Sequence, residues 1–430
     1  MNTIRNKNSL WRWLSPGMKM KRHIILIILG ILFLICGWFC CFNTNFFIFI
    51  KDNLRVLFRH SHQLIIVLGI FLEISGLGLI IWGIRNLNRS IVRTIAPKYA
   101  DKISELVYTK HVLSKGPKIV TIGGGTGLYV LLRGLKKITN NLTAVVTVFD
   151  SGGSSGRLRK ELGVLPPGDI RNCLVALATD EPLMEQLFQY RFPNGSLEGH
   201  SFGNLFITAM SEVSGDFVKA IEKSSEILSI RGKVLPSSLQ NVTLLARTPE
   251  GEIIRGENEI TRSNKRIDRI YLEPEDVLPL PETLEAIEQA ELIILGPGSL
   301  YTSVICNLLV KGISKTIINS KALKLYICNV MTQLGETNNY SASQHLKEVE
   351  RYLGQDCLDY MIVNTAQISE ELKEKYAREG SYQVIIDRTE IQKRKVKLIE
   401  RELWLDHHLA RHDSDLLARL INELFIEEKR

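Results

Sequence analysis

The chain has 430 residues, of which 45% are hydrophobic and 23% are charged. Intrinsic disorder is excluded because there is ample apolar material for a core, and seven cysteines in this length exclude a small disulfide scaffold. The net charge is +8, but residues 1–114 hold 15 Lys/Arg against 4 Asp/Glu, whereas residues 115–430 hold 39 against 42. The basic excess therefore belongs to one end of the chain and does not indicate nucleic-acid binding.

Two apolar runs in the basic end predict a transmembrane hairpin within residues 1–90. Ile24–Phe42 contains no charge, and Leu64–Ile84 contains only Glu73. As helices they are about 28 and 32 Å long, which matches a hydrocarbon core of about 30 Å. Two buried core helices are the alternative, but the run lengths and the basic flanks favour membrane spans.

The distribution of Lys and Arg predicts how the hairpin is oriented. Six precede the first span, six follow the second, and only three lie between the spans. Because basic residues favour the cytoplasmic side, we expect a two-span protein of the cell membrane with both termini and the globular domain in the cytoplasm. Glu73 is expected to make an interhelical or protonated polar contact in a simple anchor, with a proton or ion site as the alternative.

Residues 91–116 form a predicted linker, and residues 117–430 form one predicted domain in which strands and helices alternate. This alternation predicts an α/β fold, a Rossmann-like parallel sheet with helices on both faces. Residues 231–283 are expected to be an insertion or cap, and residues 365–430 closing strands and a terminal helix. The expected strands are 118–122, 143–149, 292–295, 325–329 and 360–363, and the expected helices are 128–137, 168–178, 202–212, 299–310 and 341–353.

A glycine cluster directly follows the first expected strand and precedes a helix. Glycines allow a sharp turn and close approach of a ligand to the backbone, and the helix start presents free N–H groups to an anion. The cluster is not a P-loop, because no Gly-Lys-Ser/Thr follows, and it lacks the Rossmann glycine spacing. We expect a phosphate cradle formed by Gly123, Gly124, Gly125, Thr126 and Gly127.

A second Ser/Gly-rich turn follows the second expected strand. Asp150 closes that strand, where a carboxylate can accept hydrogen bonds from a ribose, take a magnesium ion or cap a turn. Serine and arginine side chains in the same loop can bind a diphosphate. The candidate residues are Asp150, Gly153, Ser154, Ser155 and Arg157.

Three further turns open expected helices. Asp169 in the third is a natural helix cap, and His200 in the fourth is a general base, a hydrogen-bond donor to a ligand or a structural group. One polyphosphate at one edge of the sheet would engage several such turns at once. The candidate residues are Asp169 and Asn172, then His200, Gly203 and Asn204, and finally Gly298 and Ser299.

Histidines and aspartates near the C-terminus resemble a metal-binding cluster. His408 and His412 have i, i+4 spacing, but no HExxH motif is present, and we interpret residues 406–413 as helix capping and packing. The cysteines show no CxxC pair, so no metal site is expected.

The ordered motifs GGGTGL, VTVFDSGGSSGRLR, PPGDIRNCL, GHSFGNLF, GPGSLYTS and YICNVMTQLGET resemble the YvcK family of gluconeogenesis factors, within the CofD-like superfamily. The resemblance covers about residues 117–420. It implies a pocket for UDP-sugars such as UDP-N-acetylglucosamine, and a regulator of cell shape, envelope synthesis and carbon metabolism without established catalysis. By motif position, the glycine cradle, the Asp150–Arg157 loop, His200, Asn204, Gly298 and Ser299 would line the cleft.

Two other functions remain open. The CofD branch implies a transferase that places 2-phospholactate on a deazaflavin precursor, with a guanylyl-activated donor and magnesium. An NAD-dependent oxidoreductase is suggested only by Asp150. The family often has Asp-Asp before GGSSG, whereas this chain has Asp150-Ser151, which weakens a metal-assisted reaction. No resident cofactor or catalytic residue is therefore expected. The expected partners are the membrane, a UDP-sugar and an unidentified protein of envelope synthesis, and a homodimer is left open.

Overall fold

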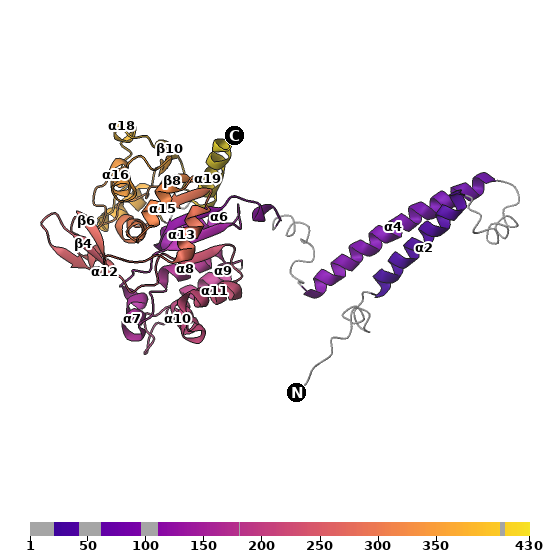
Figure 1. Cartoon of the computed structure of the whole chain (residues 1–430), viewed down its shortest axis with the longest axis horizontal. Coiled ribbons are helices and arrows are strands. Elements are labelled where there is room, and N and C mark those ends of the chain that lie inside the picture. The colour runs from indigo at the N-terminus through magenta and orange to yellow at the C-terminus, as the bar shows by residue number, and fades with distance from the viewer. Residues whose placement is uncertain (1–20, 43–61, 96–110, 180, 405–408) are drawn as a thin grey trace. The chain divides into compact units, whose positions relative to one another are not determined.

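The computed structural model describes residues 21–42, 62–95, 111–179, 181–404 and 409–430. The chain divides into two compact units, Met1–Thr109 and Lys110–Arg430 (Figure 1). The described residues overlap the predicted linker of residues 91–116 at both ends. Helix α4 continues to Ile95. Within the second unit, residues 111–114 form a helical turn, and the Leu113 carbonyl accepts a hydrogen bond from the Asn140 N–H.

The first unit is an antiparallel pair of helices, α2 (Lys21–Phe42) and α4 (His62–Ile95). A β-carbon on Gly30 would lie 2.7 Å from the Gly76 oxygen, and one on Gly37 would lie 2.7 Å from the Gly69 oxygen. Such close backbone contact through small residues is typical of membrane helices. By length and composition both helices could cross a membrane, and Glu73 lies against Gly37 of the neighbouring helix.

The second unit is built on a seven-stranded parallel sheet with the order β10-β9-β8-β7-β1-β2-β3. The chain starts in the middle at β1, proceeds outward to β3, and then returns to β7 on the other side of β1. The strands are β1 (Ile119–Gly123), β2 (Leu142–Val146), β3 (Lys233–Pro236), β7 (Leu292–Leu295), β8 (Leu323–Ile327), β9 (Tyr360–Asn364) and β10 (Lys397–Arg401).

Helices cover both faces of this sheet, as the sequence predicts. Parallel crossovers are right-handed, so outward growth in opposite directions from β1 and β7 places two helix groups on opposite faces. α6, α8 and α19 pack together, as do α13, α15 and α16. The helices are α6 (Gly125–Leu135), α7 (Gly153–Leu162), α8 (Gly168–Leu177), α9 (Glu181–Gln189), α10 (Phe202–Ser214), α11 (Phe217–Leu228), α13 (Pro281–Glu288), α14 (Cys306–Leu308), α15 (Ile313–Asn319), α16 (Ala342–Leu353), α17 (Glu370–Arg378), α18 (Arg388–Ile391) and α19 (Ser414–Glu428).

The core lies along the central strands. Every residue of β1, β7 and β9 is buried, which is the pattern of strands covered on both faces. The expected helix over residues 299–310 is instead a π-helical turn, η3 (Leu300–Ile305), followed by the short α14. This wider turn begins directly after the glycine turn of β7, at the carboxyl edge of the sheet.

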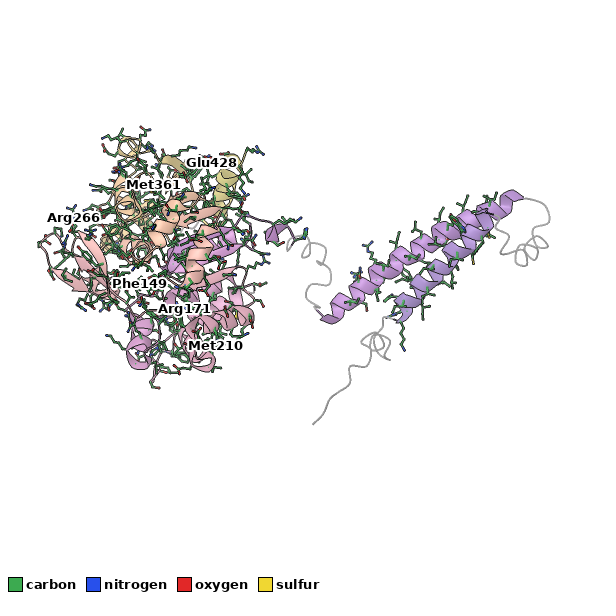
Figure 2. The ribbon with its side chains drawn as sticks, in the orientation of Figure 1. Phe149, Arg171, Met210, Arg266, Met361 and Glu428 are labelled. Carbon is green, nitrogen blue, oxygen red and sulfur yellow. The ribbon has the colours of Figure 1, made fainter. Side chains whose placement is uncertain are left out.

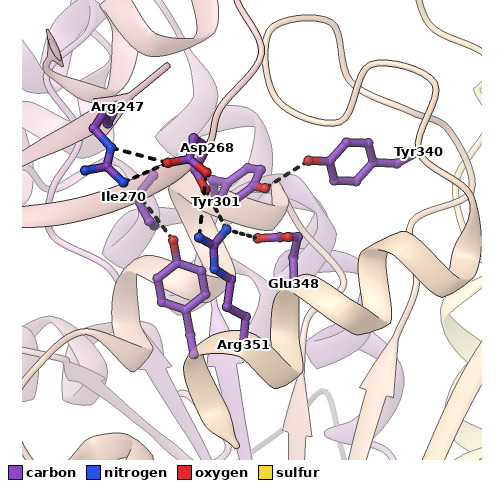
Figure 3. A network of polar contacts seen from close by, with 8 residues as sticks. Arg247, Asp268, Ile270, Tyr301, Tyr340, Glu348 and Arg351 are labelled. Carbon is purple, nitrogen blue, oxygen red and sulfur yellow. Dashed lines mark hydrogen bonds and ion pairs between the residues drawn. The ribbon is translucent and has the colours of Figure 1, made fainter. Parts of the chain in front are cut away.

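The prediction that residues 231–283 form an insertion or cap is partly wrong, because β3 belongs to the main sheet. The remainder forms a three-stranded antiparallel sheet, β5-β4-β6, with β4 (Thr243–Arg247), β5 (Ile253–Arg255), β6 (Arg269–Glu273) and helix α12 (Glu257–Arg262). Figure 3 shows how this small sheet meets α16: Asp268 accepts from Arg247 at 2.8 Å, and Arg351 donates to the Asp268 carbonyl at 2.6 Å. These half-exposed contacts fix position more than they add stability.

Candidate ligand-binding site

The glycine turns after β1 and β7 meet at the carboxyl edge of the sheet, where the strand order reverses. A β-carbon on Gly127 would lie 2.5 Å from the Pro297 oxygen, and one on Gly298 would lie 3.2 Å from the Gly124 oxygen. The two backbones therefore touch directly, which only glycine permits. Ligands of open α/β sheets bind at such a topological switch point.

Helix α6 begins inside the first glycine turn. Gly125 has φ +64°, a conformation that favours glycine, and no side chain caps the helix start at Gly124. The Asp169 carboxylate faces the Gly125 N–H, so the N–H groups left for an anion in the first turn are those of Thr126 and Gly127. The structure brings Gly124, Gly125, Thr126 and Gly127 to one wall, whereas Gly123, which we expected in the same cradle, ends β1 and does not line the pocket.

These turns enclose a cavity of about 280 Å³, here called the glycine pocket. Gly298 and Ser299 lie on its second wall. Asn329 holds the Gly298 backbone from both sides, because its Oδ1 accepts from the Gly298 N–H at 3.1 Å and its Nδ2 donates to the carbonyl at 2.8 Å. The lining residues are Gly124–Gly127, Val130, Pro297–Ser299, Ser303, Asn329–Gln333, Tyr376, Ser381 and Ala410–His412.

Arg411 is a pocket residue that the sequence analysis missed. We interpreted residues 406–413 as capping and packing, and Asp413 does cap α19 by accepting from the Asp415 and Leu416 N–H groups. His412 is buried and bonds the Cys328 carbonyl at 2.9 Å. The neighbouring Arg411, however, is exposed and lines the glycine pocket. His408 lies outside the described residues.

The Asp150–Arg157 loop lines a different cavity. Gly153, Ser154 and Arg157 border a hollow of about 440 Å³, here called the basic cavity. None of its lining residues belongs to the glycine pocket. The lining residues are Ser151–Ser154, Gly156, Arg157, Lys160, Arg191, Gly199, Asn258 and Arg262. The single cleft that the motif positions imply is thus divided into two cavities.

Buried polar side chains from three motifs form a network beneath the basic cavity. The Ser154 hydroxyl lies 3.1 Å from His200 Nδ1 and accepts from Asn204 Nδ2 at 3.1 Å. Arg171, buried inside the domain (Figure 2), donates to Asn204 Oδ1 at 3.1 Å and to Asn172 Oδ1 at 2.8 Å. Burial and the charge of Arg157 lower the pKa of His200, so His200 is neutral near pH 7.

Several other candidate residues shape the walls rather than line either cavity. Ser155 accepts from Asn204 Nδ2 at 3.3 Å. A β-carbon on Gly203 would lie 2.7 Å from the Arg171 side chain, so Gly203 makes room for it. Neither residue borders the glycine pocket or the basic cavity, and the same holds for Asp150, Asp169, Asn172, His200 and Asn204. The structure therefore places these predicted site residues behind the cavity surfaces and not on them, and their part in ligand binding stays a prediction.

Asp150 and Asp169 lie close to each other beneath the turns. Asp150 caps the turn, because its Oδ1 accepts from the Gly152 N–H at 2.8 Å. Asp169 is not the helix cap that we expected: the cap of α8 is Pro167, and Asp169 lies in its first turn. Its carboxylate faces the Gly125 N–H, and burial together with the charge of Asp150 raises its pKa to about 7.

Two further acidic residues were missed. Glu257 of α12 has a pKa raised to about 8 by burial and by Asp150, Glu336 and Asp169. Glu336 is buried and accepts from the Tyr301 N–H at 3.0 Å and the Thr302 hydroxyl at 2.7 Å, which fixes η3. Within the described residues, no three His, Cys, Asp or Glu side chains are placed to hold a metal ion.

Comparison with known proteins gives consistent matches. Residues 119–404 match the family described as 2-phospho-L-lactate transferase CofD. A Clostridium acetobutylicum relative is 44% identical over 97% of this chain and 92% of its own length. The gluconeogenesis factor of Bacillus subtilis is 47% identical over 73% of this chain and all of its own length.

A solved structure agrees with these matches. A crystal structure of a Bacillus halodurans protein aligns with a TM-score of 0.70 at 48% identity, and it covers 72% of this chain and all of its own chain. The matched part corresponds in extent to the globular unit. This chain therefore belongs to the gluconeogenesis-factor family, the YvcK-like group of CofD-like proteins.

Proposed function

We propose that this protein is a membrane-anchored, cytoplasmic UDP-sugar-binding regulator that affects cell shape, envelope synthesis and carbon metabolism. The observation that carries the proposal is the glycine pocket. It combines the start of α6, where Gly124 supplies no side-chain cap, two glycine turns in direct contact and one cationic side chain, Arg411, at the topological switch point. This combination suits the phosphates of a nucleotide.

The chemistry of the pocket supports a binding role. The Thr126 and Gly127 N–H groups at the start of α6 would donate to the diphosphate oxygens, and Arg411 can bind the same group with two parallel hydrogen bonds. Most other lining residues are uncharged, which suits a nucleoside and a sugar. A volume of 280 Å³ lies at the lower end of the range of about 300–1,000 Å³ for ligand pockets, so part of the ligand would extend toward the opening.

Membrane anchoring is supported by α2 and α4. Both are long and apolar enough to span a bilayer, they pack through glycines, and basic residues flank them. Relatives such as the Clostridium acetobutylicum protein align over this region as well. We propose that the hairpin holds the globular domain at the cytoplasmic face, near the lipid-linked precursors of the envelope.

The alternative is a CofD-like transferase of 2-phospholactate. The hydrogen bond between Ser154 and His200 is the observation that favours it, because a hydroxyl beside a neutral imidazole can be activated as a nucleophile. Magnesium needs only one or two carboxylates when phosphates supply further ligands, and Asp150 and Asp169, although they line neither cavity, would be the carboxylates nearest both glycine turns. A metal ion there would neutralise phosphate charge.

Calorimetric titration of residues 110–430 separates these functions. This unit corresponds to whole relatives such as the Bacillus subtilis protein, so it can be produced alone. UDP-N-acetylglucosamine, NAD and GTP are titrated with and without magnesium. Selective UDP-sugar binding, with the ligand recovered intact, supports the regulator. Magnesium-dependent binding of GTP in place of the UDP-sugar would refute it in favour of the transferase.

A matched pair of variants tests the assignment of the pocket. Arg411→Gln is expected to weaken UDP-N-acetylglucosamine binding about tenfold or more, because a charged hydrogen bond contributes about 1.5–3 kcal/mol. Arg419→Gln removes the same charge from an exposed position on α19 and should leave the affinity unchanged. Equal affinities for both variants would show that the ligand does not contact Arg411.

A further inference from the structure

The basic cavity gathers cations from three separate parts of the chain. Arg157 and Lys160 come from α7, Arg262 from the last turn of α12, and Arg191 from the segment after α9. Figure 1 shows α7 below the small sheet that carries α12. Four positive charges around one hollow of 440 Å³ create a local field that attracts anions.

The chain leaves these charges largely uncompensated. Arg157 donates to the Glu198 carbonyl at 2.6 Å, and Arg191 donates to the Gly199 carbonyl at 3.0 Å. Among the described residues no carboxylate forms an ion pair with Arg157, Lys160 or Arg191, and the carboxylate nearest Arg262 is Glu259 at 3.9 Å. Four like charges with only one described carboxylate at ion-pair distance, Glu259, repel one another, so a bound anion would relieve the repulsion.

The cavity also contains open backbone donors. Helix α7 has ten residues and no side-chain cap at Gly152. A β-carbon added to Gly153 would find nothing within 4 Å, so this turn faces open space. Ser154 lies at the base of the cavity with its hydroxyl fixed by His200 and Asn204. The cavity therefore presents N–H groups and a fixed hydroxyl alongside the four cations.

Two carboxylates separate this cavity from the glycine pocket. The Asp169 carboxylate packs against the Gly124 backbone of the glycine pocket, and Asp150 bonds the Gly152 N–H of the basic cavity. Asp150 and Asp169 act on each other electrostatically and lie behind the walls of the two cavities, since neither side chain lines one. The two cavities share no lining residue, which favours two ligands over one that occupies both.

We propose that the basic cavity binds a second, separate ligand that carries a phosphate or diphosphate group. The anion site is inferred from the four cations and the cavity alone. That its ligand is distinct from the nucleotide sugar rests on the proposed function. The protein would then respond to two ligands, a nucleotide sugar in the glycine pocket and a phosphorylated small molecule in the basic cavity.

Inorganic pyrophosphate is the probe, titrated by calorimetry into residues 110–430 at constant ionic strength, alone and after saturation with UDP-N-acetylglucosamine. The test variant is Lys160→Gln with Arg262→Gln, since both side chains are exposed and hold no structural hydrogen bond among the described residues. The control is Lys347→Gln with Arg419→Gln, which removes the same charge from exposed positions on α16 and α19. Far-ultraviolet circular dichroism and thermal melting verify the folding of all variants.

We expect pyrophosphate to bind one site in the UDP-sugar-saturated protein. The Lys160/Arg262 variant should lose at least about tenfold in pyrophosphate affinity, while the control variant and the UDP-sugar affinity stay unchanged. Competition between pyrophosphate and the UDP-sugar, with both weakened in the test variant, would overturn the proposal in favour of one extended ligand. Equal weak binding by all variants would overturn it as non-specific attraction, and so would no binding. Pyrophosphate binding without UDP-sugar binding would refute the proposed function but not the anion site.

Discussion

The contact between the two glycine turns makes Gly127 the most sensitive position of the glycine pocket. An alanine β-carbon there would lie 2.5 Å from the Pro297 oxygen and 2.7 Å from the Pro297 carbonyl carbon. Side-chain β-carbons essentially never approach within 3.0 Å, so the turn after β7 would have to move by at least about 0.5 Å. Asn329 resists this movement, because it holds Gly298 through two hydrogen bonds.

The expected cost follows from these contacts. Overpacking of this kind lowers the free energy of unfolding by about 1–3 kcal/mol. Alanine in place of glycine inside a helix raises it by about 1 kcal/mol. Gly127→Ala should therefore be destabilised by up to about 2 kcal/mol and should bind UDP-N-acetylglucosamine at least about tenfold more weakly, because both pocket walls shift. Chemical denaturation measures the first effect and calorimetry the second.

Gly123→Ala is the matched control, since Gly123 ends β1 four residues before Gly127 and does not line the glycine pocket. A β-carbon on Gly123 would meet its nearest atoms at 3.9 Å, which is ordinary van der Waals contact. This variant should keep both stability and affinity within error of the unmodified protein. If Gly127→Ala behaved like Gly123→Ala in both assays, the two turns would not be in backbone contact and the pocket described above would be wrong.

Three further predictions address binding, acidity and topology. Gly125→Val puts a β-branched side chain at a φ of +64°, so the variant should lose stability even though the nearest atom to its β-carbon is Ser303 Oγ at 3.8 Å. It should also abolish nucleotide binding by filling the cradle, and unchanged calorimetric affinity in the variant, with folding verified by circular dichroism, would show that the cradle is not the binding site. Burial lowers the pKa of His412 to about 4, below its ordinary 6.5, so His412 contributes stability above pH 6.5 that is lost as pH falls toward 4. Denaturation at pH 7.5 and 4.5 should show the stability advantage over His412→Gln shrink by about 1–3 kcal/mol, and a constant difference would contradict a buried neutral imidazole. A cysteine at Asn53, in a variant without Cys36, Cys40 and Cys41, should be labelled from outside the cell, and labelling only from the cytoplasm would reverse the topology.

Local patterns in the sequence were sufficient for most of the sheet. Continuous apolar runs predicted β1, β7 and β9, because strands buried on both faces have no polar alternation. β3 and β10 were not assigned individually, since β3 is short and flanked by charges and β10 is only half-buried. The π-helical turn η3 was missed as well. It is fixed by the buried Glu336, which lies more than thirty residues later in the chain, and a local pattern carries no signal for such a contact.

The site is divided into two cavities because of the order of the strands in the sheet. The order of the motifs along the chain does not predict that strand order. Gly123–Gly127 follow β1, and the turn at Gly298 follows β7, which lies on one side of β1 in the sheet. The Asp150–Arg157 loop follows β2, which lies on the other side. Because neighbouring strands place their following turns side by side, the β1 and β7 turns share one pocket. The β2 loop instead meets α12 of the small sheet, through the hydrogen bond from the Asn258 N–H to Ser151. Arg411 lines the glycine pocket and Arg262 the basic cavity, and both come from segments far from the glycine turns in the chain. The glycine turns therefore predict which edge of the sheet binds ligands, but they do not predict the charged residues that select them.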